Sequence, residues 1–302
     1  MTDFILHHHD PSPFAEKIRL VFGIKGLAWR SVQIPLIMPK PDLTALTGGY
    51  RKTPVVQVGA DVYLDSLLIA QEIEARHPEP TLFPQWPRGL SLALGRWSDK
   101  ACFEPGAALS MGENPQVPEA VIDDRKNFFN FMDFSKLADS LPDARFQAEA
   151  QFAILDDALA ARPFLDGEQP GWTDILGWFP VWMVQANVPS ASELLAPFAN
   201  IATWSERMHA VGHGERTDID ANEAIALAAS TTPTDNGSVR DNPLGLTSGD
   251  PVAVFADDYG QDEMTGTLLH LDLHRITIRR EDERAGALNL HAPTSGFLVR
   301  KQ

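Results

Sequence analysis

The spacing of apolar residues changes twice along this chain, and these changes constrain the fold more than any other feature. Residues 1 to about 84 mix short apolar runs with helical patterns, residues 89 to about 229 repeat apolar positions every three or four residues, and residues 251–302 alternate apolar with polar. Spacings of three or four are typical of amphipathic helices, and alternation is typical of half-buried strands. The sequence therefore predicts a mixed α/β region, an all-helical region and a small all-β region.

The first region predicts a mixed sheet with helices on its faces. Short apolar runs predict strands at residues 4–8, 31–36, 53–59 and 62–66. Helical patterns begin at Pro13 and Leu67, which gives the order strand, helix, strand, hairpin, helix. The proline-rich segment 77–89 has no period and predicts a linker. We therefore place the first domain at residues 1–84 and an all-helical domain at residues 85–229.

The last region predicts a separate β domain. Residues 230–250 are rich in Ser, Thr, Asn, Gly and Pro and predict a flexible connector. Beyond them, alternating segments divided by Gly-containing turns predict a small antiparallel barrel of about five strands over residues 251–302. Within segment 267–280 the apolar residues change from odd to even numbers, which predicts a bulge or tight turn near His274 and Arg275.

Composition excludes several classes of protein. No run approaches the roughly 18 apolar residues of a membrane span, and the start "MTDFILHHHD" has neither a basic segment nor a long apolar one. We therefore expect no membrane partner, no secretory signal and a cytoplasmic location. A formal net charge of −16 argues against nucleic-acid binding, whose affinity comes largely from Lys and Arg.

Metal and redox chemistry have little support in the sequence. The single cysteine, Cys102, rules out an internal disulfide, a CxxC pair and a cysteine-based zinc cluster. We expect it to be a small buried hydrophobic residue. Strand alternation sends His7 and His9 to one face and His8 to the other, so we expect no metal site there.

Ser12 stands immediately before Pro13, where a helical pattern begins. Serine is a favoured N-cap residue and proline a favoured first helical residue. A hydroxyl at that point faces unpaired backbone N–H groups and the positive end of the helix dipole, where an anion is stabilised. Two interpretations stay open: a helix cap alone, or a hydroxyl that also stabilises a bound anion.

The segment "TPVVQVGADVYLDS" joins a strand that starts at Pro54 to a second strand and to a helix that opens at Asp65 and Ser66. Proline is ordinary at a strand start, because it lacks the N–H that a strand ladder uses. Aspartate and serine are likewise favoured at helix starts, so capping is their simplest role.

Together with the helical domain that follows, "SPFAEKIRLVF", "TPVVQV" and "YLDSLLIAQEIE" resemble the cytosolic glutathione transferases over roughly residues 3–228. The resemblance implies a thioredoxin-like first domain and a glutathione-transferase-type helical domain. The "SPF" helix start is similar to the serine- and cysteine-type classes, including bacterial β-etherase-like members. The C-terminal barrel lies outside the common two-domain plan, and the resemblance gives it no role.

The resemblance also implies the glutathione-binding residues. Pro54 would follow a cis bond, and Val55 would pair its backbone with the cysteine of glutathione. Asp65 and Ser66 would hold the γ-glutamyl end, and Ser12 would activate the thiol. Lowering a thiol pKa by about two units requires roughly 2.7 kcal/mol, which a charged hydrogen bond of about 1.5–3 kcal/mol and the helix dipole together supply.

Other parts of the ligand need further residues. The glycyl carboxylate requires local positive charge, for which the candidates are Lys40, Arg51 and Lys52; the sequence does not choose among them, and we name Lys52. Trp97 and Phe103 are our candidates for lining an apolar substrate pocket. One departure from the family pattern is glycine at position 171 in "PGWTDI", where a Ser or Thr cap is usual.

These observations predict a glutathione S-transferase-like homodimer that uses glutathione as co-substrate, without metal, to attack an apolar electrophile. The identity of the electrophile is not encoded in any motif. Two alternatives stay open: a glutathione- or partner-binding module without turnover, whose barrel is an interaction domain, and a thioredoxin-fold protein that does not bind glutathione.

Overall fold

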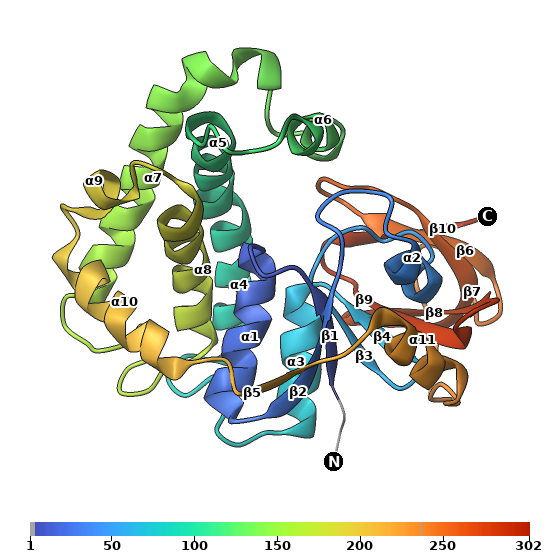
Figure 1. Cartoon of the computed structure of the whole chain (residues 1–302). Helices are drawn as coiled ribbons and strands as arrows, with labels where there is room; N and C mark the ends of the chain where they lie inside the picture. The colour runs from blue at the N-terminus through green and yellow to red at the C-terminus, as the bar shows by residue number, and fades with distance from the viewer. Residues whose placement is uncertain (1–3, 236) are drawn as a thin grey trace. The chain divides into compact units, whose positions relative to one another are not determined.

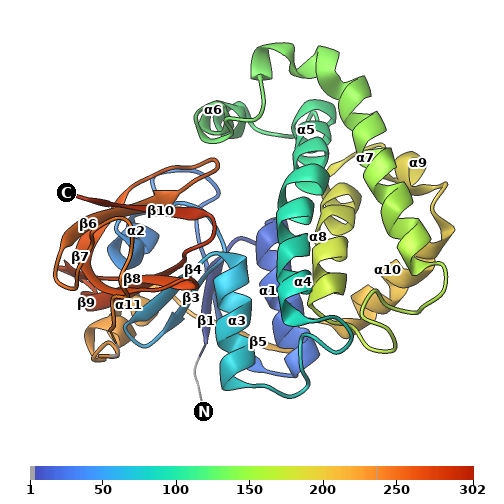
Figure 2. The same cartoon turned by 180° about the vertical axis from the view of Figure 1, so that it is seen from behind.

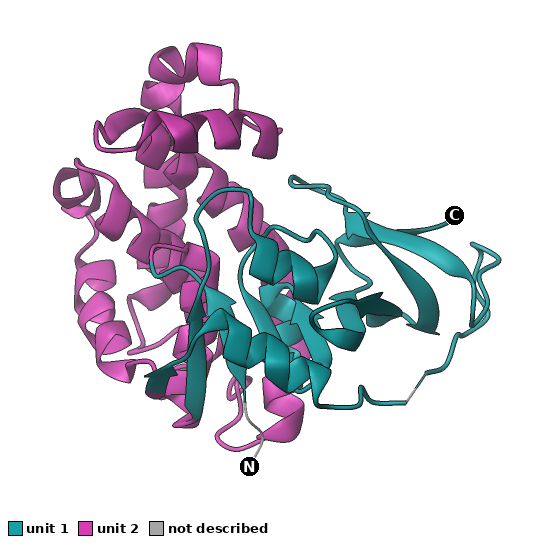
Figure 3. Cartoon of the chain, turned by 45° about the vertical axis from the view of Figure 1, so that its right-hand side comes forward, with its two compact units in different colours: residues 1–10, 28–72, 216–302 teal, residues 11–27, 73–215 magenta. Residues whose placement is uncertain are grey.

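The computed structural model describes residues 4–235 and 237–302. Close contacts group the chain into two compact units, shown in Figure 3. Unit 1 comprises residues 1–10, 28–72 and 216–302, and unit 2 comprises residues 11–27 and 73–215. The domain boundaries expected from sequence stay a prediction.

Four strands of unit 1 form the mixed sheet that the sequence predicts. They are β1 (Ile5–His8), β2 (Ala28–Gln33), β3 (Val55–Val58) and β4 (Asp61–Leu64). β1 pairs parallel with β2 and antiparallel with β3, and β3 pairs antiparallel with β4, in the spatial order of a thioredoxin-like domain. β2 begins three residues earlier than the predicted strand at 31–36. Every residue of β1 and β4 is buried, as expected for a sheet covered on both faces.

Unit 1 also contains two short elements that the sequence analysis did not predict. Helix α2 (Pro41–Thr47) has proline in its first turn and ends at Gly48, which adopts a left-handed conformation with φ 74°. Strand β5 (Glu215–Asp218) extends the sheet beyond β2. Helix α11 (Ala221–Ala229) follows β5 and contacts both α2 and the C-terminal strand β9 (Gly286–Pro293).

The predicted C-terminal strands are confirmed. They are β6 (Pro251–Ala256), β7 (Met264–Leu271), β8 (Arg275–Asp282), β9 (Gly286–Pro293) and β10 (Phe297–Lys301), drawn in orange and red in Figure 1. All pair antiparallel, in the order β10-β6-β7-β8-β9. The predicted irregularity near His274 and Arg275 is also present. A tight turn spans residues 272–274, and the register between β7 and β8 shifts between Leu268 and His270.

These five strands continue the N-terminal sheet, a connection that the sequence analysis did not foresee. β9 pairs parallel with β4, with Val62 opposite Leu290 and Tyr63 opposite His291. The result is one ten-stranded sheet. Val62 and Leu290 belong to a single hydrophobic core that draws on both ends of the chain. Burial of apolar area shared in this way makes the C-terminal strands part of the first domain's core rather than a separate one.

The connector before β6 has its own contacts with this sheet. Thr234 donates to the Asp61 carboxylate from its backbone N–H and its hydroxyl, at 3.1 and 2.9 Å. The Arg240 N–H donates to the Leu271 carbonyl over 3.0 Å. The described part of segment 230–250 therefore lies along the sheet, while residue 236 is outside the described residues.

Unit 2 is helical, as predicted. It contains α1 (Pro13–Lys25), α4 (Arg88–Trp97), α5 (Phe103–Glu113), α6 (Glu119–Phe128), α7 (Leu137–Leu159), α8 (Trp172–Asn187), α9 (Ala191–Leu195) and α10 (Ala199–Val211). A π-helical turn (Ser98–Cys102) joins α4 to α5, and helix α3 (Ser66–Arg76) runs from unit 1 into unit 2. Figure 2 shows α5 beside α7 and α8, in agreement with their contacts. No described helix is long and apolar enough to cross a membrane.

The contacts at the start of α8 explain why glycine stands at position 171, where the family usually has a Ser or Thr cap. Asp174 accepts the N–H of Gly171 over 3.2 Å, and Asp166 accepts the N–H of Thr173 over 2.8 Å. A Cβ at position 171 would lie only 2.5 Å from Asp166 Oδ2. Asp166 therefore supplies the cap that a Ser or Thr provides elsewhere, and it needs glycine to make room.

Candidate functional site

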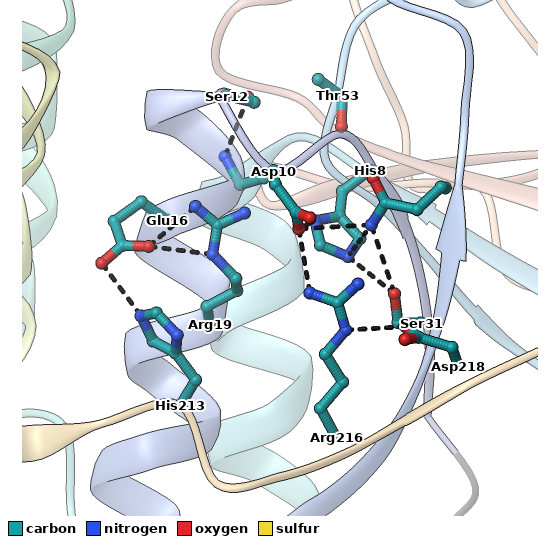
Figure 4. A network of polar contacts seen from close by, with 12 residues as sticks. His8, Asp10, Ser12, Glu16, Arg19, Ser31, Thr53, His213, Arg216 and Asp218 are labelled. Atoms are coloured by element: carbon teal, nitrogen blue, oxygen red, sulfur yellow. Dashed lines mark hydrogen bonds and ion pairs between the residues drawn. The ribbon is translucent and has the colours of Figure 1, made fainter. Parts of the chain in front are cut away.

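Ser12 is the N-cap of α1, as the sequence predicts. Its backbone is extended, and its Oγ accepts the Ala15 N–H over 3.2 Å, as Figure 4 shows. The side chain is buried. Accepting this bond uses a lone pair of the oxygen rather than its proton, so the hydroxyl can still donate a hydrogen bond. Ser12 therefore presents a donor at the positive end of a helix of 13 residues.

Glu16, one turn along α1, is a buried acid whose charge is balanced within unit 2. Its Oε2 accepts from Arg19 Nε over 2.9 Å, and its Oε1 lies 3.0 Å from Nε2 of His213. Burial opposes ionisation, but the hydrogen bond of His213 and the charge of Arg19 outweigh it and lower the pKa of Glu16. With Arg19 paired to it, this carboxylate adds little net negative charge beside Ser12.

The start of β3 carries the geometry that the family resemblance implies. The Thr53–Pro54 bond is cis, and both Pro54 and Val55 are buried. Val55 lies opposite His7 on one side and Leu64 on the other. The Thr53 hydroxyl donates to the His7 carbonyl over 3.2 Å and fixes this end of the strand against β1.

Asp65 and Ser66 form the turn between β4 and α3. Among the described residues, Asp65 is the only one other than glycine with a positive φ, at 71°. Its Oδ1 accepts the Leu67 N–H over 2.8 Å and its carbonyl accepts the Ile69 N–H over 3.0 Å. Aspartate tolerates this conformation because its short side chain can bond locally. Such backbone outliers cluster at functional sites, which supports the predicted role of this turn.

Two of the three candidate cations, Lys40 and Lys52, have different environments. Lys40 is buried and donates to the Arg51 carbonyl over 2.9 Å, so its ammonium braces the backbone. Lys52 forms an ion pair with Asp258, and its Nζ lies 4.2 Å from the ring centre of Tyr259. Asp258 and Tyr259 belong to the loop between β6 and β7 and were not candidates from sequence.

Tyr50 joins the same group of side chains. Its hydroxyl is buried, and burial, together with the negative charges of Asp65 and Asp258, raises its pKa well above the usual value. Tyr50, Lys52, Asp65 and Asp258 therefore lie in one cluster within unit 1. The structure thus brings the candidates for the two ends of glutathione together with the C-terminal loop.

Unit 2 gathers aromatic rings close to the start of α1. Phe103 is buried, and its ring centre lies 4.8 Å from that of Phe14 and 6.0 Å from that of Phe131. Phe179 completes the group at 5.2 Å from Phe14. Trp97 is half-buried and donates from Nε1 to Gln151 over 3.0 Å, so its polar atom is satisfied by a neighbouring helix.

The same region holds a buried cation and the single cysteine. Lys17 pairs with Asp99, and its Nζ lies 4.0 Å from the Phe179 ring centre. Cys102 is buried, as predicted, and burial raises the pKa of its thiol to about 12. Because a nucleophilic cysteine must be a thiolate, Cys102 is inert at neutral pH.

The N-terminal histidines are tied into the sheet. His7 Nε2 lies 2.9 Å from Gln57 Oε1, and burial lowers the pKa of His7 to about 4. His8 Nε2 lies 3.1 Å from Ser31 Oγ. Over the described ranges, no group of three or more His, Cys, Asp or Glu side chains is placed to hold a metal ion.

Comparison with known proteins decides the family. A GST-like protein from Pseudomonas syringae, solved by crystallography, is 34% identical, and the alignment covers 100% of both chains with a TM-score of 0.82. This chain belongs to the glutathione S-transferase family. The alignment with this GST-like relative includes residues 251–302, so the C-terminal strands belong to the shared similarity.

Further matches agree with this glutathione S-transferase assignment. The family profile of the glutathione S-transferase N-terminal domain matches residues 6–81, and that of the C-terminal domain matches residues 122–211. Glutathione S-transferase U4 of Arabidopsis thaliana is 23% identical over 124 residues, which are 40% of this chain and 55% of that protein. The chain thus matches only about half the length of that curated relative.

A more distant structure shows the common fold. A glutathione S-transferase from Methylobacterium radiotolerans, solved in complex with glutathione sulfonate, is 22% identical and has a TM-score of 0.51 over 72% of this chain and 98% of its own. Within this glutathione S-transferase fold, sequence reasoning found Ser12 and the Asp65–Ser66 turn from local cap signals. It missed Asp258 and Tyr259, because no local pattern links them to Lys52.

Proposed function

We propose that this glutathione S-transferase binds reduced glutathione, ionises its thiol and transfers the sulfur to an apolar electrophile. The observation that carries the proposal is the buried Ser12 hydroxyl, which caps α1 through its oxygen and keeps its proton to donate. A thiolate is the anion that such a donor, at a helix N-terminus, stabilises.

Unit 1 would hold the peptide part of glutathione. Val55, directly after the cis-proline at the start of β3, would present its backbone to the cysteinyl residue of glutathione at that strand end. The buried Ser66 and the carboxylate of Asp65 would bind the γ-glutamyl carboxylate and ammonium. Lys52 would take the glycyl carboxylate.

Chain connectivity supports the role of Ser12. His8 is the last residue of β1, which pairs with β3 through His7 and Val55. Ser12 follows His8 by four residues, and a chain of that length spans at most about 14 Å. The proposal requires such a short connection, because Ser12 and Val55 would act on the same tripeptide.

The chemistry is a nucleophilic substitution or addition. The thiol of glutathione loses its proton to solvent, and the sulfur is held as a thiolate by the Ser12 O–H and the helix end. Its lone pair forms a bond to an electrophilic carbon. Either a leaving group departs with the electrons of its bond to that carbon, or the electrons of a π-bond at that carbon move to the neighbouring atom, which takes up a proton from solvent. We propose that Phe103 and Trp97, with the ring of Phe14, form the apolar wall for that carbon skeleton.

The family and its proposed co-substrate support two further proposals, on location and on assembly. Reduced glutathione is the thiol buffer of the cytosol, so we propose a cytoplasmic enzyme. We also propose a homodimer, as glutathione S-transferases commonly form. Sedimentation velocity of the full chain tests the second statement, and a single monomeric species would contradict it.

The test of function separates binding from turnover. Glutathione binding by calorimetry and conjugation with a nitro-activated aryl halide, an epoxide and a benzylic ether are measured for the natural chain, Ser12→Ala, Ser66→Ala and the exposed control Ser230→Ala. We expect Ser12→Ala to bind glutathione but to lose about 10- to 100-fold in rate, as for a lost charged hydrogen bond. Ser66→Ala should weaken binding, and the control should match the natural chain. No turnover of any electrophile, or no loss in Ser12→Ala, would overturn the proposal.

A further inference from the structure

A carboxylate from the loop between β6 and β7 is paired with Lys52, the cation that we assign to the glycyl carboxylate of glutathione. Asp258 pairs with Lys52, and 206 residues separate them in the sequence. The Lys52 side chain is only 13% exposed, whereas that of Asp258 is 49% exposed. Both residues belong to unit 1. A half-exposed aspartate can be displaced by a ligand, while the lysine stays in place.

The contact between loop and cation is held in position by its surroundings. The Tyr50 ring centre lies 6.1 Å from that of Phe297, and Arg280 donates to the Ala45 carbonyl. A Cβ on Gly49 would lie 3.5 Å from the carbonyl oxygen of Glu263, at the end of the same loop. The segment that leads to β3 is therefore braced by β8, β10 and the β6–β7 loop, so the approach of Asp258 to Lys52 is built into the fold.

The charged groups around Lys52 do not favour the binding of a further anion. Asp65 and Asp258 both raise the pKa of the buried Tyr50 hydroxyl, after burial itself, which places two carboxylates around one phenol. The ring of Tyr259 lies against the Lys52 ammonium as well. A ligand carboxylate that approaches Lys52 therefore meets an ammonium that is already paired.

We propose that Asp258 is a specificity-determining residue. By pairing with Lys52, it makes the site bind glutathione with a free glycyl carboxylate hardly better than a derivative whose glycyl end is neutral. This inference rests on the proposed glutathione binding. Glutathione must displace Asp258 from Lys52. The ion pair between its glycyl carboxylate and Lys52 then replaces the internal pair between Lys52 and Asp258. A derivative whose glycyl carboxyl is esterified makes no such exchange, because it leaves the internal pair intact. The natural chain should therefore bind the acid and the ester with similar affinity.

Calorimetry with two ligands tests the inference. Reduced glutathione and its glycyl monoethyl ester are titrated into the natural chain, Asp258→Asn, Asp258→Asn combined with Lys52→Met, and the control Asp262→Asn, which changes an exposed aspartate of the same loop. We expect Asp258→Asn to bind glutathione about fivefold more tightly and the ester with unchanged affinity, a difference of the size of one partly exposed ion pair. Lys52→Met should abolish that gain.

The outcomes separate the two proposals. Equal changes for acid and ester in Asp258→Asn, or a gain that survives Lys52→Met, would overturn the role of Asp258 and leave glutathione binding intact. An equal gain in Asp262→Asn would also overturn it, because general loss of negative charge would then be the cause. Failure of both ligands to bind any chain would overturn the proposed function and this inference with it.

Discussion

The Asp61 carboxylate lies 2.9 Å from Nε2 of His291, although 230 residues separate the two in the chain. Asp61 opens β4 and His291 lies on β9, so this contact crosses the junction between the N-terminal and C-terminal strands. Burial lowers the pKa of His291 in spite of the carboxylate, which keeps the imidazole neutral. A neutral ring can donate from Nε2 to Asp61 and accept at Nδ1 from the Thr277 hydroxyl, 3.0 Å away.

We predict that His291→Leu lowers the free energy of unfolding by about 1–3 kcal/mol, because the Thr277 hydroxyl loses its buried partner and Asp61 keeps only its bonds from Thr234 and Asn289. His291→Gln, which keeps polar atoms at that position, should lose less. The folded-state pKa of His291 lies below its usual 6.5, so its neutral form stabilises the fold above that pH and this contribution is lost as pH falls. Urea unfolding at several pH values checks both statements. Equal stability of His291→Leu and the natural chain would show that the network does not hold the junction.

We predict the opposite pH dependence for Asp166. Burial and the nearby Asp174 raise the pKa of Asp166 to about 6, and Asp166 Oδ1 is buried without a hydrogen-bond partner in the part of the chain that the structure describes. A raised carboxyl pKa means that the folded state takes up the proton more readily, so this group destabilises the fold as pH rises from about 4 through 6.

The Asp166→Asn variant isolates that contribution. It keeps an oxygen for the Thr173 N–H and removes the charge, so we expect a gain of about 1–3 kcal/mol at pH values well above 6, which shrinks as the pH falls to about 5. Thermal unfolding over this range measures it, with the exposed Asp143→Asn as control. A gain that is constant with pH would contradict the role of ionisation.

The left-handed turn at Asp65 gives a prediction that separates backbone from charge. Asparagine tolerates the same φ and can accept the Leu67 N–H, whereas alanine can do neither well. Asp65→Ala should lose about 1–2 kcal/mol of stability and Asp65→Asn much less. Both should weaken glutathione binding, because the carboxylate that pairs with the γ-glutamyl ammonium is lost. Calorimetry that finds full affinity in Asp65→Asn would remove that role from Asp65.

Local patterns made much of the fold predictable. Alternation over residues 251–302 is visible within one strand at a time, so about five antiparallel strands could be predicted there, and the structure has β6 to β10 in this range. The cap signal Ser12-Pro13 was equally local. Helix α2, with seven residues, is too short to show a period, and β5 lies among exposed residues with no apolar pattern to mark it.

Long-range pairing was beyond the reach of these patterns. The parallel contact of β4 with β9 depends on complementary buried side chains such as Val62 and Leu290, which no spacing links. For the same reason the ion pair of Lys52 with Asp258 could not be predicted. The sequence alone provides no ground to choose Lys52 over the other two candidate cations. Ser12 shows both sides of this. Its role as a helix cap can be predicted from the neighbouring residues, whereas its chemical role depends on which ligand binds beside its hydroxyl.

The ionisation of bound glutathione tests the central claim most directly. The ultraviolet absorbance of the thiolate is titrated against pH for glutathione bound to the natural chain, to Ser12→Ala and to Ser12→Thr. We predict that the natural chain lowers the thiol pKa by about two units from its usual value near 8.5, that Ser12→Thr keeps most of this shift, and that Ser12→Ala returns the pKa by at least about one unit toward the free value. A thiol pKa that is the same in all three chains would contradict the account.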